Sequence, residues 1–273
     1  MTGGPAGTGL LALLARRDRA IVPVGLAAAI GLAWAWLLAG AGSGMSPVEM
    51  TAMAGMDGWL MRPAVWTPAY AALIFVMWWV MMAAMMLPSA VPALLIFAGV
   101  AQGRPGQERP ARDAAARVAA MAVGYLLAWG GFSLAATALQ WGLEWLRAMS
   151  PMMIVTNRWL GVAILAAAGA WQLTPLKAMC LRHCRSPLGH LMAHWRPGLG
   201  GALRMGLGHG AWCLGCCWGL MGLLFFGGVM NLWWIIGLTL LVILEKTVRA
   251  GRWLERLTGA ALLGWAAALA LGL

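Results

Sequence analysis

The 273 residues are 62% hydrophobic and only 10% charged. Soluble domains carry about 25% charged residues, so this composition excludes an ordinary water-soluble enzyme or binding domain. Charge-free stretches of about 20 residues recur along the chain, as a bilayer with a hydrocarbon core roughly 30 Å thick requires. We therefore predict an all-α, polytopic transmembrane helix bundle that forms a single integral membrane domain over residues 1–273.

The apolar runs predict seven transmembrane spans. In chain order they cover residues 21–40, 70–99, 118–141, 159–176, 205–226, 232–244 and 257–273. Pro88 and Pro92 lie inside the second of these runs, where proline removes backbone hydrogen bonds and kinks a helix. Gly227, Gly228 and Asn231 predict a tight turn between the fifth and sixth spans.

The charge distribution predicts the orientation of the chain. A net charge of +11 would suggest nucleic acid as the partner of a soluble protein. With seven spans and a cytoplasmic N-terminus, the outside segments retain only Arg62, Arg147 and Arg158 of the 19 basic residues. The positive-inside rule thus predicts that the N-terminus is inside and the C-terminus outside. We expect a multi-pass protein of the bacterial inner membrane, in contact with the lipid bilayer and with no nucleic acid partner.

The sharpest chemical signal is the string GHGAWCLGCCW, near the start of the predicted fifth span. It contains His209, Cys213, Cys216 and Cys217. Spacings of three and four residues return to one face of a helix, so these side chains line one wall. Imidazole and thiolate suit copper(I) and zinc, whereas calcium and magnesium prefer oxygen. The string therefore predicts a soft-metal site.

A second cysteine string, LKAMCLRHCRSP, follows the predicted fourth span. It carries Cys180 and Cys184 four residues apart, with His183 between them. Since the fifth span begins on the same predicted side, all five cysteines of the chain can converge near one membrane face. The basic residues Lys177, Arg182 and Arg185 would favour the thiolate form. A single cysteine is usually a small apolar filler, but this grouping favours metal binding over packing or a disulfide relay.

Methionine supplies the third signal. Met77, Met81 and Met85 follow one another at spacing four in the second predicted span, which stacks their thioethers along one stripe. Ordinary packing is an equally good explanation of that stripe. The first predicted external segment adds thioethers in a polar stretch, where packing would not explain them if the segment is exposed. These are Met45, Met50, Met53 and Met56.

The combination of ligands predicts the metal. Thioether sulfur binds copper(I) well and zinc poorly, so copper(I) is the predicted ion and zinc is the alternative. Methionine lies in the predicted external segment and span, and cysteine at the predicted cytoplasmic end. Ligand strength therefore rises inward, as inward movement of copper(I) would require.

We expect minor roles for the charged and imidazole side chains near the predicted span ends. Glu245 and Lys246 close the sixth predicted span. We expect an interfacial pair whose charged ends reach water, with Glu245 as a metal ligand or a partner of one as the alternative. His190 and His194 lie four residues apart and are expected to be interfacial polar residues.

Four strings carry a resemblance to a known family. They are MWWVMMAAMMLP, TPLKAMCLRHCRSPLGHLMAHW, HGAWCLGCCWGLMGLLFFGGVMNLWW and LEKTVRAG, within residues 69–251. The chain resembles an uncharacterised bacterial family of predicted metal-binding integral membrane proteins, a domain of unknown function. The resemblance implies metal binding in a membrane, with all five cysteines on the family's pattern. Arg249 stands where we would expect a proline, which puts a role for that turn in doubt.

Three functions compete on this evidence. The first is a membrane-embedded soft-metal, copper(I), binding protein that transfers or transports the ion. ATP-driven pumping by this chain is not predicted, because the sequence has no Walker phosphate loop. The second is an accessory or assembly subunit of a membrane complex with a structural metal site, and the third is a thiol redox protein. An enzyme is the weaker expectation. Partners would be a membrane or periplasmic metal-handling protein, or further subunits of a homo- or hetero-oligomer.

Overall fold

The described part of the chain is helical. The computed structural model describes residues 6–42, 46–52, 65–102, 111–248 and 252–273. Within those ranges no strand forms, and an isolated backbone bridge joins Met149 to Val155. The predicted all-α class is confirmed.

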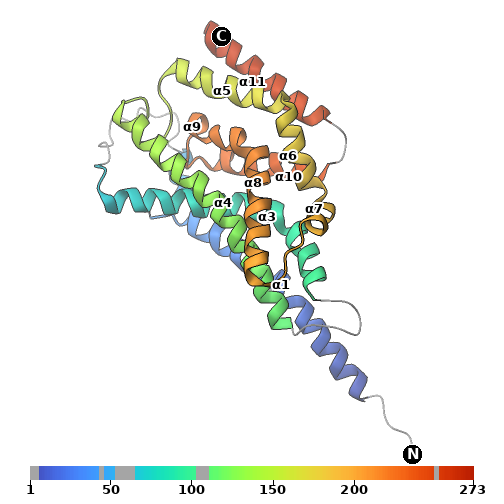
Figure 1. Ribbon diagram of the computed structural model, residues 1–273. Helices are drawn as coiled ribbons and strands as arrows, with labels where there is room; N and C mark the ends of the chain where they lie inside the picture. The colour runs from blue at the N-terminus through green and yellow to red at the C-terminus, as the bar shows by residue number, and fades with distance from the viewer. Residues whose placement is uncertain (1–5, 43–45, 53–64, 103–110, 249–251) are drawn as a thin grey trace, which may run out of the picture.

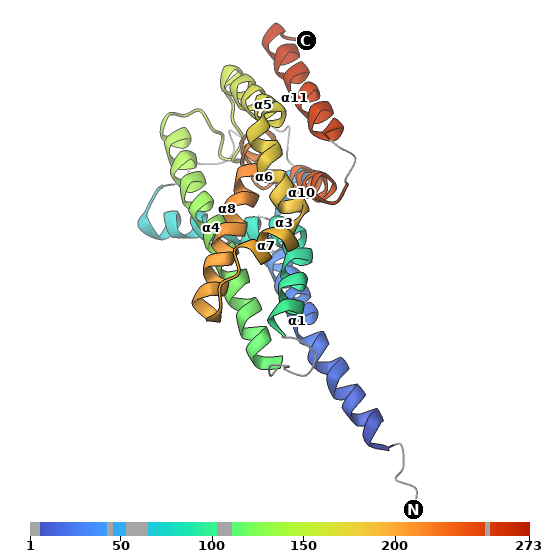
Figure 2. The same ribbon diagram turned by 45° about the vertical axis from the view of Figure 1, so that its right-hand side comes forward.

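In the described ranges, eight longer helices make the body of the molecule, and three short ones lie between them. The longer ones are α1 (Ala6–Leu38), α3 (Pro68–Ala101), α4 (Ala111–Trp145), α5 (Arg158–Leu173), α6 (Pro175–Arg185), α8 (Gly198–Gly222), α10 (Leu232–Thr247) and α11 (Trp253–Leu271). The short ones are α2 (Pro47–Ala52), α7 (Pro187–Ala193) and α9 (Leu224–Gly227). In Figures 1 and 2, α5 and α11 lie side by side at the C-terminal end, whereas the start of α1 projects from the opposite end.

Several helices are long and apolar enough to cross a membrane. They are the segments Ala20–Leu38, Pro68–Ala101, Arg112–Trp145, Gly198–Gly227 and Trp253–Leu271. α5 and α6 would add one more if they cross together, although they are bent by 65° at the break between them. α10, predicted as a span of its own, has 16 residues, short of the roughly 20 that a span needs. The described residues thus hold five or six candidate spans, and seven spans with the N-terminus inside stay a prediction.

Helix α8 begins earlier than the sequence suggested. Pro197 is its N-cap and Gly198 its first residue, whereas the predicted span began at Met205. Arg204 therefore lies inside the helix, and Cys213 to Cys217 lie in its second half. The string containing the cysteines is thus deep in the helix and far from its start.

Close packing against α4 explains why the glycine-rich start of α8 is helical. A Cβ on Gly206 would lie 2.0 Å from the carbonyl oxygen of Met121, and one on Gly124 would lie 2.1 Å from that of Leu203. Only glycine allows two backbones to approach so closely, which is a common device where membrane helices cross. The crossing holds the wall of α8 that carries the thiols against α4.

Helix α3 continues through its two prolines but changes direction along its length (Figure 1). Pro88 has no N–H, which leaves the carbonyl of Ala84 without its helical partner. The indole Nε1 of Trp34 donates to that carbonyl at 3.0 Å. The nearby carbonyl of Met86 accepts from the hydroxyls of Ser89 (2.7 Å) and Tyr125 (3.1 Å). Neighbouring side chains therefore satisfy the backbone at the bend, as an apolar interior demands.

Because α4 and α8 cross so closely, we predict that alanine destabilises the protein at a glycine of the crossing but not at a glycine outside it. Gly206→Ala forces α4 and α8 apart, and overpacking of this kind costs about 1–3 kcal/mol. Gly131→Ala on α4 is the matched control, because nothing lies within 4 Å of its added Cβ. In thermal unfolding of the detergent-solubilised protein, Gly206→Ala should lower the midpoint by several degrees and Gly131→Ala should not. Equal midpoints would show that the two backbones are not in contact.

Candidate metal centre

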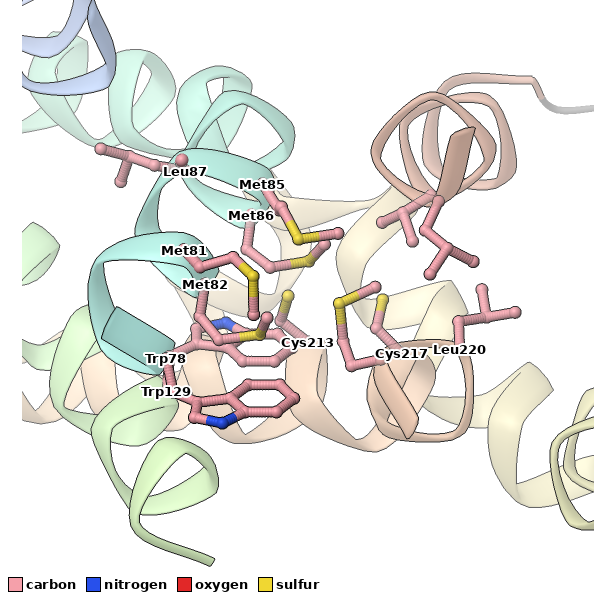
Figure 3. Packing of buried hydrophobic residues seen from close by; sticks show 14 of the residues in the cluster. Trp78, Met81, Met82, Met85, Met86, Leu87, Trp129, Cys213, Cys217 and Leu220 are labelled. Carbon is pink, nitrogen blue, oxygen red and sulfur yellow. The ribbon is translucent and has the colours of Figure 1, made fainter. Parts of the chain in front are cut away.

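Buried sulfur atoms gather between α3 and α8. Met77, Met81 and Met85 of the predicted stripe are completely buried, as are Met82 and Met86 beside them. Figure 3 shows Met81, Met85 and Met86 projecting from α3 toward Cys213 and Cys217 of α8. The fold therefore brings part of the methionine stripe to the wall that carries the thiols.

Cysteine thiols of α6 and α8 contact one another. The Sγ atoms of Cys216 and Cys217 are 3.2 Å apart, and that of Cys184 on α6 lies 3.8 Å from Cys216. Cys180, one turn earlier on α6, touches α8 at Gly215, where an added Cβ would lie 2.7 Å from its Sγ. All five cysteines are free thiols.

The thiols touch one another, but they do not form a ready-made metal site with three ligands. Among the described residues, no group of three or more His, Cys, Asp or Glu side chains is arranged to hold a metal ion. Methionine is not among these four residue types, and copper(I) accepts thioether as well as thiolate ligands. A site here would therefore combine thiols of α8 with thioethers of α3.

The two candidate histidines lie in different surroundings. His209 is buried on α8, with its ring 5.8 Å from that of Tyr125. His183 stacks flat on Trp212, with ring centroids 4.0 Å apart, and its Nδ1 is 2.9 Å from the carbonyl oxygen of Met179. His183 lines a cavity between α6 and α8, whereas the sulfur of Cys184 contacts Cys216.

The candidate methionines of the first external segment are only partly described. Met50 is buried on α2, so packing accounts for it and the argument from an exposed thioether does not apply. The other candidates, Met45, Met53 and Met56, lie outside the described residues. Thr51, beside Met50, accepts a hydrogen bond from the backbone N–H of Leu232 at 2.8 Å, which ties α2 to the start of α10.

Polar groups that the sequence pattern did not single out lie beside Cys213. The ammonium of Lys246 donates to Cys213 Sγ at 3.0 Å and to Ser89 Oγ at 2.8 Å. The hydroxyl of Tyr125 lies 3.0 Å from the same sulfur. α4 and α10 therefore each place a polar group against one cysteine of α8, and Ser89 of α3 binds the ammonium from its other side. The positive charge of Lys246 stabilises negative charge on that sulfur, and it does so strongly in a low-dielectric interior.

The expectation of an interfacial Glu245–Lys246 pair is wrong. The two side chains are only 1% and 9% exposed, because they lie on the buried face of α10 and each charge has its own partner. Glu245 Oε2 accepts from Lys177 Nζ at 2.7 Å, so Lys177 faces this carboxylate. Ionisable residues in an apolar run are functional by default, and that signal would have singled out Lys246.

A buried polar network fixes α6 beside α10. The side-chain amide of Gln172 donates to Glu245 Oε1 at 2.8 Å, and Lys177 donates to Gln172 as well. Arg185 donates from Nε to the Glu245 carbonyl at 2.7 Å and pairs with Glu255 of α11 at 3.1 Å. These contacts hold Cys180 and Cys184 of α6 at a fixed place relative to Lys246.

Removing one charge of the buried Lys177–Glu245 pair should destabilise the protein, and removing the second charge as well should restore most of the lost stability. Lys177→Met leaves Glu245 as an uncompensated buried charge, which costs about 3–5 kcal/mol. Lys177→Met combined with Glu245→Gln removes both charges and should recover most of that loss. The measurement is the thermal midpoint of the detergent-solubilised variants, with the exposed Arg256→Gln as the control. A double variant as unstable as Lys177→Met would contradict a charge-pair role.

Comparison with known proteins gives one family. A family model described as "PpoB2: Copper chaperone" matches residues 75–269. The match covers well over half of the chain and contains every cysteine, the methionine stripe and Lys246, whereas α1 and α2 lie outside it. No curated protein matches, and no solved structure matches.

The metal-related part of the resemblance found in the sequence is thereby confirmed. The match also supports copper as the metal, and a copper-handling role in general. Taken with the extent of the match, these findings place the chain in the PpoB2 family of copper chaperones.

Proposed function

We propose that this protein is a membrane-embedded chaperone that binds copper(I) between α3 and α8 and passes it to a partner protein. The observation that carries the proposal is the meeting of thioethers and thiols from two helices around Cys213, beside the ammonium of Lys246. Cys213 and Cys217 would be the thiolate ligands, and Met81 and Met85 the thioethers. Copper(I) is the cargo of this site.

Charge balance supports copper(I) over zinc. Two thiolates and one monovalent cation carry a net charge of −1, which the nearby Lys246 ammonium neutralises. A divalent ion with the same ligands would leave a net positive charge in the interior, where an uncompensated charge is strongly unfavourable. Thioether ligands add a second preference in the same direction, because they bind copper(I) well and zinc poorly.

The difference in burial between α6 and α8 supports transfer over a structural metal. As residues, Cys213, Cys216 and Cys217 are buried, whereas Cys180 and Cys184 of α6 are partly exposed. Cys184 is in contact with Cys216, so a chain of sulfur atoms runs from the buried site toward the surface of α6. Structural metal sites are closed by their ligands, and a site with partly accessible thiols is suited to ligand exchange with a partner.

Metal content tests the proposal. The full-length protein, purified in detergent under reducing conditions and supplied with copper(I) and zinc together, should retain stoichiometric copper by mass spectrometry. Cys213→Ser with Cys217→Ser should abolish retention, because both thiolates are lost. Met81→Leu with Met85→Leu should weaken it, and Met152→Leu with Met153→Leu is the matched control at two buried methionines outside the site.

Two results would contradict this function. One is a wild-type protein that takes up zinc in preference to copper(I), which would favour a structural zinc site. The other is full copper retention by the double serine variant, which would show that the ion binds elsewhere in the chain.

A further inference from the structure

A cavity of about 440 Å³ lies between the α6–α7 segment and the first half of α8. Its size falls within the range of roughly 300–1,000 Å³ typical of small-molecule sites. No cysteine is among the described residues that line it. The cavity is therefore separate from the copper site proposed above, and the chemistry of its own lining decides what it can bind.

Four basic side chains line the cavity. Arg196 and Arg204 contribute guanidinium groups on either side of the start of α8, and His183 and His194 contribute imidazoles. None of the described lining residues is acidic. A guanidinium binds phosphate or carboxylate through two parallel hydrogen bonds, whereas a pair of guanidinium groups repels a cation. The cavity therefore fits an anionic group.

The rest of the lining is apolar. Met205, Gly208 and Trp212 share one face of α8, because they follow one another at steps of three and four residues. Leu191 of α7 adds a buried aliphatic side chain. A Cβ added to Gly208 would meet nothing within 4 Å, so open space lies over this face. The cavity thus joins a cationic part to an apolar part, as an amphipathic ligand requires.

The helix beside the cavity belongs to a segment long and apolar enough to cross a membrane, Gly198–Gly227. Arg196 precedes this segment, so the cationic part of the cavity lies at one end of it, where lipid headgroups would meet a spanning helix. Two exposed apolar side chains are next to lining residues in the chain, Met192 on α7 and Leu207 on α8. Basic pockets between membrane helices are typical sites for anionic headgroups.

We propose that this cavity binds the phosphate of an anionic phospholipid. Arg196 and Arg204 hold the phosphate oxygens, and the glycerol and the start of an acyl chain lie over Gly208. The same arginines disfavour a headgroup that carries its own cation, so phosphatidylglycerol is preferred to phosphatidylcholine. A free phosphate ion would satisfy the arginines but would leave the apolar lining uncovered, which makes the lipid the better source of the phosphate.

Native mass spectrometry of the full-length protein in detergent tests the headgroup preference, with phosphatidylglycerol and phosphatidylcholine of the same acyl chains supplied in equal amounts. The wild type should retain phosphatidylglycerol over phosphatidylcholine by about tenfold, since charge-assisted contacts form to one headgroup and the cation of the other is repelled. Arg196→Gln with Arg204→Gln should abolish that preference. Arg182→Gln with Arg256→Gln is the matched control, because it removes the same charge from two exposed arginines outside the cavity.

Filling the cavity tests the place of binding without changing a charge. Gly208→Leu puts a side chain into the open space of the cavity and should lower phosphatidylglycerol retention to the level of the double arginine variant. Gly222→Leu is the matched control at the other end of α8, because its added Cβ also meets nothing within 4 Å and the residue does not line the cavity. It should retain phosphatidylglycerol as the wild type does.

Three results would overturn the inference. One is equal retention of the two lipids by the wild type, and another is unchanged phosphatidylglycerol retention by Gly208→Leu or by the double arginine variant. The third is displacement of bound phosphatidylglycerol by an equal concentration of inorganic phosphate, which would make the free ion the ligand of this cavity.

Discussion

The contact between the ammonium of Lys246 and the sulfur of Cys213 is the interaction on which the rest of the centre depends. A lysine enters an apolar interior only when an opposite charge or several hydrogen bonds compensate it. Here Ser89 and Cys213 accept its hydrogen bonds, at 2.8 and 3.0 Å. In the proposed copper(I) site, the same ammonium would favour a thiolate and then a thiolate bound to a monovalent cation. The charge of Lys246 and the charge of the proposed cargo would thus be linked through one sulfur atom.

The remaining architecture keeps that contact in place. Glycines at the α4–α8 crossing set the depth and rotation of α8, and with them the direction in which its cysteines point. The bend of α3 presents thioethers to α8 while Trp34 and Tyr125 satisfy the backbone at the bend. The Lys177–Glu245 pair anchors α10 through the residue next to Lys246. Each of these contacts destabilises the protein if only one of its partners is present. The candidate centre therefore needs its surrounding helices.

The sequence predicted the parts of this protein that depend on local pattern. Hydrophobic runs located α3, α4 and α11, and spacings of three and four residues placed the cysteines of α8 and the methionines of α3 on shared faces. The early start of α8 escaped prediction because its glycines are poor helix formers whose role appears only against α4. Lys246 was misjudged because its partner, Cys213, is 33 residues away in the chain. Contacts of that kind depend on how helices pack, which local spacing does not encode.

The most direct test of the central claim is the metal preference of the protein without its buried ammonium. Competition of copper(I) and zinc against chelators of known affinity would be measured for the wild type, Lys246→Met and the exposed control Arg256→Gln. If Lys246 neutralises a copper(I)–dithiolate centre, Lys246→Met should weaken copper(I) binding by about 10- to 100-fold, as loss of a partner of the metal ligands does, and shift the preference toward zinc. An unchanged ratio of the two affinities would contradict the claim.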